Sequence, residues 1–159
     1  MSDFTKFAVG LVAFLLIMWL FFVFVVGFRM APNNDMSPSI NAGDILLYYK
    51  GGAVTDKDVI AVKKENKLYF LRVVAKGGDT VDITEDGLLI NGNTVMEDKA
   101  DGETYQYAGH TEFPLTLKKG EYFVLADHRA GGEDSRYFGT VRDSEIKGVV
   151  IAVIRKSGI

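Results

Sequence analysis

The sequence predicts an all-β domain attached to a single N-terminal transmembrane helix. Residues 7–28 contain no charged residue and only two glycines. A helix of that length spans about 33 Å, which is enough to cross a bilayer core of ~30 Å. The rest of the chain consists of short runs rich in β-branched, aliphatic and aromatic residues, separated by turn residues. No stretch beyond the apolar run keeps a helical period over ten residues.

The apolar run has two alternative interpretations, a secretory signal and a buried core helix. A cleavable signal usually has an apolar stretch of about 7–15 residues followed by a small-residue cleavage site, and Val26-Gly27-Phe28 is a poor site. A core helix that is apolar all round would need a larger protein to cover it. We therefore expect a short segment of residues 1–6, a transmembrane anchor of residues 7–28 and a folded domain of residues 29–159.

Strands are expected throughout the folded domain. In chain order they cover residues 45–49, 59–63, 68–75, 88–90, 94–95, 122–126 and 149–154. Asn91-Gly92 is favoured in tight hairpins because both central residues need positive φ. The last run is almost continuously apolar, which predicts a central position in its sheet. Residues 97–111 lack a strand pattern and are expected to form a loop or small insertion.

Composition excludes several classes of function. The absence of cysteine rules out disulfides, Cys-ligated zinc and thiol catalysis. Apart from Asp3, Lys6 and Arg29, the chain carries 16 Lys and Arg against 20 Asp and Glu, a net charge of −4. This balance argues against nucleic-acid binding, which favours a basic face. We expect no metal and no cofactor.

Four blocks carry a family resemblance in their order and spacing. They are residues 35–38 with the strand entry at 41–47, residues 58–62, residues 71–81 leading into the hairpin at 89–92, and residues 122–129 with 134–139. These blocks resemble the motifs of type I signal peptidases, the membrane-anchored serine proteases that remove signal peptides. Those motifs are Ser-Met-x-Pro, Gly-Asp-x-Val, Lys-Arg-Val-x-Gly-x-Pro-Gly-Asp, and Gly-Asp-Asn-Arg with Ser-x-Asp-Ser-Arg. The resemblance implies a signal-peptidase-like, LexA-like β fold, a cytoplasmic N-terminus and an extracytoplasmic domain.

The chemical positions of that family are altered in this chain. The resemblance implies a serine nucleophile before Met36, a lysine base before Arg72, and a serine three residues after Arg129 that orients the amine. This chain has Asp35, Leu71 and Gly132 at those positions. Catalysis needs a neutral lysine in an apolar pocket, and leucine can neither accept nor deliver a proton. Three replacements at three chemical positions indicate a site that no longer performs the reaction.

Displaced groups could in principle supply an amine or a hydroxyl. Lys76 lies five residues past the lysine position, about 17 Å along an extended strand, so it would need a bulge or turn to reach the same place. Ser37 or Ser39 could act with His110 or His128, but a shift of two residues moves the hydroxyl by roughly 7 Å. That displacement is too large for oxyanion donors, which act at about 3 Å.

A carboxylate mechanism is the remaining catalytic alternative. Asp35 and Asp134 could activate water as an aspartic-type dyad, which requires two carboxyl groups sharing one proton. Arg136 would tend to keep Asp134 ionised, which opposes that arrangement.

Without catalysis, the resemblance implies a surface that binds an extended peptide. We expect Asp35, Met36, Pro38 and Leu71 to line its groove, with the Asp35 charge suited to a lysine or a backbone N–H of a partner. A structural framework of ion pairs and hydrogen bonds is expected from the motif residues Arg72, Asp127, Arg129, Asp134, Ser135 and Arg136.

Signal-peptidase-like proteins without the Ser-Lys pair occur in pilus-assembly loci of Gram-positive bacteria, where they act beside a sortase. Aspartate at the serine position and an apolar residue at the lysine position resemble that group. This resemblance implies a non-catalytic accessory or chaperone factor that binds a pilin or the sortase at the cell membrane. Two alternatives stay open: an active signal peptidase with relocated catalytic groups, and a tethered structural or interaction domain. The sequence leaves the oligomeric state open.

Overall fold

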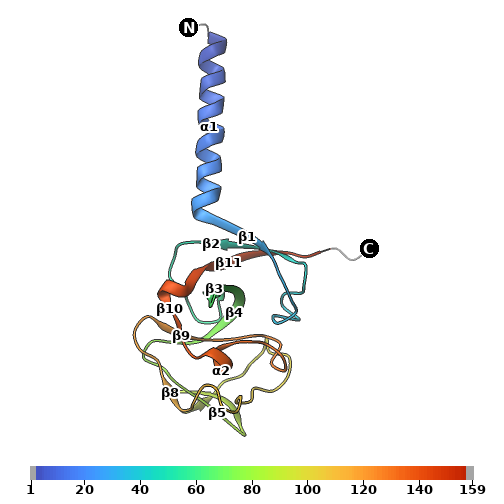
Figure 1. Ribbon diagram of the computed structural model, residues 1–159, viewed down its shortest axis with the longest axis vertical. Coiled ribbons are helices and arrows are strands. Elements are labelled where there is room, and N and C mark those ends of the chain that lie inside the picture. The colour runs from blue at the N-terminus through green and yellow to red at the C-terminus, as the bar shows by residue number, and fades with distance from the viewer. Residues whose placement is uncertain (1–2, 157–159) are drawn as a thin grey trace.

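One long helix projects from a β domain (Figure 1). The structure, a computed structural model, describes residues 3–156. Helix α1 (Asp3–Val25) buries none of its side chains against the domain and is long and apolar enough to cross a membrane. The expected bounds of residues 7–28 differ from this helix at both ends. Residues 26–28 belong to strand β1 (Val26–Met30), because their backbone pairs with the strand that follows in sequence.

A seven-stranded antiparallel sheet forms the half of the domain next to α1 (Figure 1). Its order is β1-β2-β11-β3-β4-β9-β10. Besides β1, its strands are β2 (Ile45–Tyr49), β3 (Val59–Lys64), β4 (Lys67–Lys76), β9 (Glu121–Leu125), β10 (Val141–Arg142) and β11 (Ile146–Ile154). The helix α2 (Ser135–Phe138) and the 3₁₀ helix η1 (Asp143–Glu145) lie between β9 and β11 in sequence.

A four-stranded sheet lies at the end of the domain away from α1 (Figure 1). Its order is β7-β6-β5-β8, with β5 (Thr80–Thr84), β6 (Gly87–Ile90), β7 (Asn93–Thr94) and β8 (Leu115–Thr116). The expected hairpin joins β6 to β7, and Asn91 (φ 52°) and Gly92 (φ 78°) both have the positive φ that it needs.

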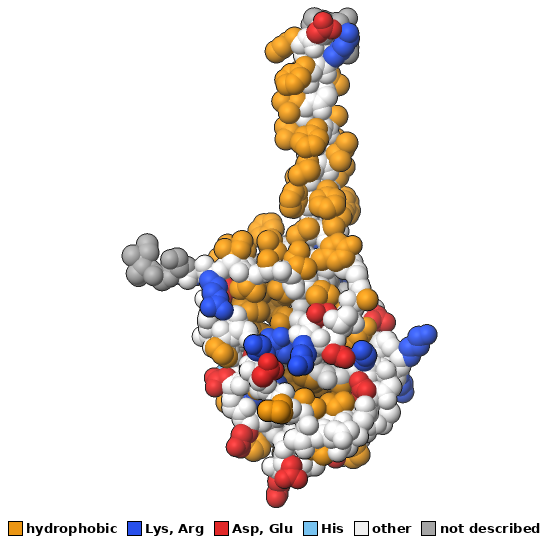
Figure 2. Space-filling view, turned by 180° about the vertical axis from the view of Figure 1, so that it is seen from behind, with side chains coloured by type: hydrophobic (Ala, Val, Ile, Leu, Met, Phe, Trp, Pro, Cys, Tyr) orange, Lys and Arg blue, Asp and Glu red, His pale blue; other side chains and the backbone are white. Residues whose placement is uncertain are grey.

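The all-β fold class is confirmed. Six of the seven expected strands agree within one residue at each end, and the last, expected at residues 149–154, begins three residues earlier as β11. Strands β5, β8 and β10 were not expected, since each is short or adjoins polar residues. Strand β11 lies between β2 and β3 as expected, but Ile151 and Ile154 on it are 61% and 53% exposed. Seen from behind, hydrophobic side chains also gather on the end of the domain nearest α1 (Figure 2). Within residues 97–111 the only strand-type contact is an isolated bridge between Asp101 and His128.

The core consists of three apolar clusters, each built from several strands. Between them they pack the two faces of the large sheet and join that sheet to the small one. The first contains Met36, Ile40, Leu46, Tyr48, Ala61 and Phe70 with Ala31. The second contains Ile60, Val62, Leu71, Val73, Val124, Ala126 and Val141. The third contains Ala75, Val81, Ile83, Leu88, Leu117, Phe123 and Leu125.

Candidate functional site

Asp35 lies in the loop between β1 and β2 and is held against the closing motif of the chain. The backbone N–H of His128 donates to the Asp35 carbonyl at 2.8 Å. The Asn33 amide Nδ2 donates to the Asp35 carboxylate at 2.6 Å, and the Asp35 backbone N–H donates to Asn33 Oδ1 at 3.3 Å. Next to it, Met36 is buried, and its sulfur accepts from the Asp127 backbone N–H at 3.5 Å. The loop thus presents the Asp35 carboxylate at a defined place.

The surroundings of Asp35 disfavour its negative charge. Burial raises the pKa of this carboxyl, and the nearby Glu133 and Asp134 raise it further, while the Asn33 bond and His128 oppose the rise. No Lys or Arg within residues 3–156 forms an ion pair with Asp35. The surroundings of Asp35 are therefore acidic, and its carboxylate has no counter-cation among the described residues.

Glu133 has its own partners beside this centre. It accepts a hydrogen bond from the Tyr69 hydroxyl at 2.8 Å and pairs with Lys67 at 3.2 Å. These hydrogen bonds, that from Tyr69 first, lower the pKa of Glu133. Burial, with Glu133 as hydrogen-bond acceptor, raises the pKa of Tyr69 to about 12. Tyr69 therefore stays a neutral donor at physiological pH and is no candidate for a general base.

Leu71 lies in the interior, which corrects the expectation that it lines a groove. It is 0% exposed and belongs to the second core cluster. Successive residues of a strand point to opposite faces, so Leu71 packs inward while Arg72 points to the other face of β4. Of the expected groove residues, Met36 is also buried, and only Asp35 and Pro38 reach the surface.

A small cavity opens beside Asp35. Its volume is about 20 Å³, which holds little more than a methyl group or one water molecule. Its lining consists of Ala31, Pro32, Asn33, Asp35, Met36, Ile40, Leu68, Tyr69 and Phe70. The region around Asp35 therefore offers a carboxylate next to a shallow, mostly apolar recess suited to a small side chain.

Gly132 is buried where no serine side chain fits. A Cβ atom placed on Gly132 would overlap the Ala126 methyl group and would lie 3.4 Å from the His128 carbonyl. Ala126 itself stands where the resembled Gly-Asp-Asn-Arg motif has glycine. The methyl of Ala126 thus occupies space that the orienting serine would need. Sequence reasoning missed Ala126, although its departure from the motif glycine was a visible signal.

The displaced amine and hydroxyl have other partners. Lys76 is exposed at the end of β4 and pairs with Asp56 at 3.2 Å. The Ser39 hydroxyl oxygen accepts from the Arg72 guanidinium at 3.4 Å. The Ser39 hydroxyl faces a cation and no base that could remove its proton, and the Lys76 amine is held by Asp56. Ser39 and Lys76 therefore do not form a replacement for the Ser-Lys pair.

Both histidine side chains have partners other than Asp35. His128 Nδ1 lies 3.2 Å from an Asp101 carboxylate oxygen. The His110 ring stacks on Tyr137 with ring centroids 4.2 Å apart. These contacts hold the two rings on loop residues.

Asp134 is buried and fully hydrogen-bonded within the protein, which argues against an aspartic-type dyad of Asp35 and Asp134. It is 0% exposed, and its two carboxylate oxygens accept from the Arg136 backbone and side chain at 2.8–3.0 Å. The Ala126 backbone N–H donates to it as well, at 3.0 Å. With these bonds and the Arg136 charge, Asp134 has no site left for a proton shared with Asp35.

The motif residues form a largely buried framework, and two of their arginines pair with acidic residues that are distant in the sequence. Arg72 donates to both oxygens of Asp127, at 2.8 and 2.6 Å, which joins β4 to the end of β9. Arg129 donates to Glu97 at 2.5 Å. Glu97, in the stretch expected to be a loop, was missed because no local pattern marks it.

Two further contacts complete this framework. The Ser135 hydroxyl oxygen accepts from the Val124 backbone N–H at 3.0 Å. The Arg136 guanidinium carbon lies 4.4 Å from the centre of the Tyr107 ring, so the ring covers this buried cation. Among residues 3–156, no group of three or more His, Cys, Asp or Glu is arranged to hold a metal ion.

Fold and site together define a β domain of the signal-peptidase type, in which Asp35, Leu71 and Gly132 occupy the three positions where the sequence motifs lead us to expect the nucleophile, the base and the orienting serine. The family model described as "Signal peptidase, peptidase S26" matches residues 4–155, and the chain belongs to this family.

Relatives with and without the word "inactive" in their names resemble the chain. "Inactive signal peptidase IA" of Staphylococcus aureus (strain MRSA252) is 26% identical over 156 residues, covering 93% of this chain and 90% of the relative. "Signal peptidase I V" of Bacillus subtilis (strain 168) is 30% identical over 131 residues, covering 73% and 78%. A crystal structure of a signal peptidase I from Enterococcus faecalis V583 superimposes with a TM-score of 0.53 at 29% identity, covering 63% of this chain and 98% of that one. The expected family and fold are thereby confirmed.

Proposed function

We propose that this protein is a non-catalytic, membrane-anchored accessory or chaperone factor in sortase-mediated pilus assembly, and that it binds a pilin or the sortase. Helix α1 serves as its single-pass anchor, with a cytoplasmic N-terminus and the β domain outside the cell. The pilus role is supported by the sequence pattern of aspartate at the serine position and an apolar residue at the lysine position. The name of the Staphylococcus aureus relatives supports the absence of catalysis.

The observation that carries the non-catalytic part is the burial of Leu71 in an apolar cluster. Ser-Lys chemistry needs an amine at this position to take the nucleophile's proton. Here the position is 0% exposed and surrounded by Val, Ile and Ala side chains. The nucleophile position holds a carboxylate, and the Ala126 methyl closes the position of the orienting serine.

The binding part rests on Asp35. A half-buried carboxylate beside other acids, without a cation, destabilises the fold in its ionised form. Sites that lower stability in this way are typical of functional positions. The ligand that complements Asp35 is an ammonium or N–H group of a partner, with a small side chain in the adjacent 20 Å³ cavity.

A cleavage assay tests the non-catalytic part. Purified full-length protein, in detergent with phospholipid, is incubated with a secretory precursor beside its Asp35→Ala variant. We expect no cleavage by either protein, because neither has a base next to a nucleophile. Cleavage by the native protein that disappears in Asp35→Ala would instead establish a carboxylate protease.

Asp35→Asn separates binding from stability. The variant keeps an oxygen for the Asn33 bond but loses the charge. Because the folded-state pKa of Asp35 is raised, the native fold binds more protons than the unfolded chain, and stability falls as pH rises through that pKa. We therefore expect Asp35→Asn to melt above the native protein at pH 7, and the difference in Tm to shrink as pH approaches 4.

In cells, the same variant is expected to reduce pilus polymer in a Gram-positive host, measured by immunoblot against a gene deletion. Wild-type polymer levels in the deletion strain, together with accumulating precursors, would contradict the pilus role and favour a peptidase. Wild-type levels in Asp35→Asn alone would leave Asp35 without a binding role.

A further inference from the structure

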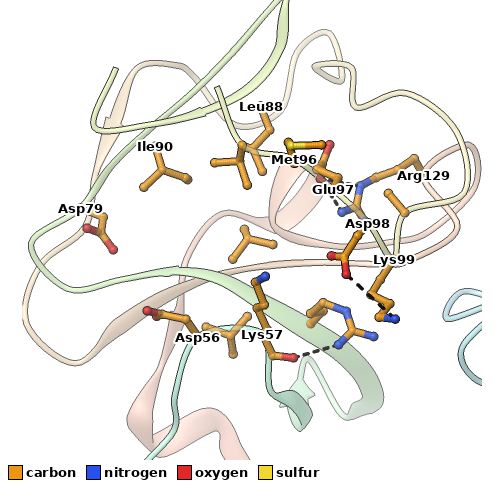
Figure 3. Close-up of a pocket in the computed structure, with 15 residues that line it drawn as sticks. Asp56, Lys57, Asp79, Leu88, Ile90, Met96, Glu97, Asp98, Lys99 and Arg129 are labelled. Carbon is orange, nitrogen blue, oxygen red and sulfur yellow. Dashed lines mark hydrogen bonds and ion pairs between the residues drawn. The ribbon is translucent and has the colours of Figure 1, made fainter. Parts of the chain in front are cut away.

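A second candidate binding surface lies on the face of β4 that carries Arg72. A cavity of about 270 Å³ opens there between β4, β6 and the segment that follows β7 (Figure 3). Its apolar wall includes Val74, Leu88, Ile90 and Val95, and Met96 stands at its edge, 90% exposed. No catalytic position of the family lies in this cavity.

A neighbouring cavity continues the first one toward β11. It measures about 370 Å³ and includes Ser39, Val150 and Ile151 in its lining. Lys57 and Arg72 line both cavities. We name the two cavities together the Lys57 trough. An elongated trough in two parts fits an extended polypeptide better than a compact small molecule.

Lys57 has an unusual backbone at the junction of the two cavities. Its φ is 70°, in the left-handed region that long side chains rarely adopt. Two bonds hold it there: the Lys57 N–H donates to the Val73 carbonyl at 2.9 Å, and Arg72 donates to the Lys57 carbonyl at 2.8 Å. Glycine or asparagine would suit this backbone better. Lysine at position 57 therefore costs stability relative to a residue that suits this backbone.

Among residues 3–156, three ionised groups that line the trough have no ion-pair partner, the cation Lys57 and the carboxylates Asp58 and Asp79. The two carboxylates instead accept hydrogen bonds, Asp58 from Thr55 and Asp79 from the Lys76 backbone N–H and the Asn91 amide. The other ionised groups that line the trough are paired within the protein: Arg72 with Asp127, Arg129 with Glu97, Asp98 with Lys99, and Asp56 with Lys76. The Lys57 amine forms no hydrogen bond or ion pair in the described part of the chain, and in Figure 3 it points into the first cavity.

The donors of Arg72 are also used. Its Nε and Nη2 donate to Asp127, and its Nη1 donates to the Lys57 carbonyl. The trough therefore offers one amine and no free guanidinium fork, which suits a single carboxylate better than a phosphate.

We propose that the Lys57 trough binds an extended peptide segment of a protein partner that carries an apolar side chain and a carboxylate two residues apart. In an extended chain, residues i and i+2 lie on the same side, about 7 Å apart. The apolar side chain enters the cavity lined by Val74, Leu88 and Ile90, and the carboxylate pairs with the Lys57 amine. The proposal rests on the proposed function only in requiring a protein partner, and it uses a site other than Asp35.

The test uses the full chain, isotopically labelled, in detergent micelles. The probe is an acetylated and amidated peptide Gly-Ser-Leu-Gly-Glu-Ser-Gly, with a Glu-to-Gln and a Leu-to-Ser version as controls. We expect saturable NMR shift changes at the amides of Lys57, Val74 and Ile90. Affinity should fall about fivefold with the Gln peptide, the effect of one exposed ion pair, and further with the Ser peptide.

Lys57→Asn distinguishes binding from structure. Asparagine tolerates the left-handed backbone, so this variant is expected to raise Tm by a few degrees while it weakens the Glu peptide about fivefold. Lys63→Gln, at an exposed lysine on β3, is the matched control and should change neither property. Equal affinity in Lys57→Asn and the native protein, or no saturable shift in the trough, would overturn the proposal. Asp35→Asn should leave this binding unchanged, so the failure of either proposal can be recognised separately.

Discussion

Replacing Gly132 by serine is expected to destabilise the domain by about 3 kcal/mol, although serine is the residue of the active family at this position. The Cβ of any residue at position 132 overlaps the Ala126 methyl, and both atoms are attached directly to buried backbone. Relief therefore requires a backbone shift and not only a change of rotamer. Chemical denaturation of the full-length protein, monitored by circular dichroism, measures the loss.

A second substitution should restore much of that stability. Ala126→Gly alone is expected to cost about 1 kcal/mol, since it removes a buried methyl group and loosens the chain. Combined with Gly132→Ser, it makes room for the serine side chain, so the double variant should be more stable than Gly132→Ser alone. Gly131→Ser is the matched control, because a Cβ there lies 3.8 Å from the nearest atom, His128 Cδ2. Equal denaturation midpoints for Gly132→Ser and Gly131→Ser would contradict the predicted overlap.

Leu71→Lys is expected to destabilise the domain by about 4 kcal/mol or more at pH 7. The substitution places an ammonium group in a cluster where Leu71 is 0% exposed, surrounded by Val62, Val73 and Val124. Burial without a counter-charge disfavours the ionised amine, so its pKa in the folded state falls below the value in the unfolded chain. The free energy of unfolding against the native protein measures the loss.

The sign of the pH dependence identifies the mechanism. Between the folded and unfolded pKa values of the new amine, the unfolded chain binds more protons, so the stability of Leu71→Lys should rise with pH toward 10. Leu71→Met, which conserves volume without a charge, should cost less than about 1.5 kcal/mol and show no such rise. A Leu71→Lys variant with native stability at pH 7 would mean that position 71 reaches water.

These two sites define what reactivation would need. Serine, lysine and the orienting serine at positions 35, 71 and 132 do not suffice, because the Ala126 methyl still fills the space at position 132. A fourth change, Ala126→Gly, is required for the side chains to coexist. The packing around position 132, and not only the three side chains, is therefore expected to oppose Ser-Lys chemistry.

Much of the fold could be predicted because its signals are local. The N-terminal apolar helix, the hairpin at Asn91-Gly92 and the strands with continuous apolar runs each depend on a few neighbouring residues. Strand β1 was not predicted, because its first residues continue the N-terminal apolar run. Strands β8 and β10, each two residues long, carry too few residues to show a pattern.

The sequence by itself predicted the chemistry of the site: motif spacing pointed to Asp35, Leu71 and Gly132. Residue type alone excludes proton transfer by leucine. Tertiary structure alone decided that Leu71 is sealed in the core and that Ala126 blocks Gly132. It also decided that Lys57 lies between two cavities, and that its amine has no partner within residues 3–156. The physical reason is that composition and spacing report what each residue can do. Burial, overlap and charge pairing depend on distances of a few ångströms between segments far apart in the chain.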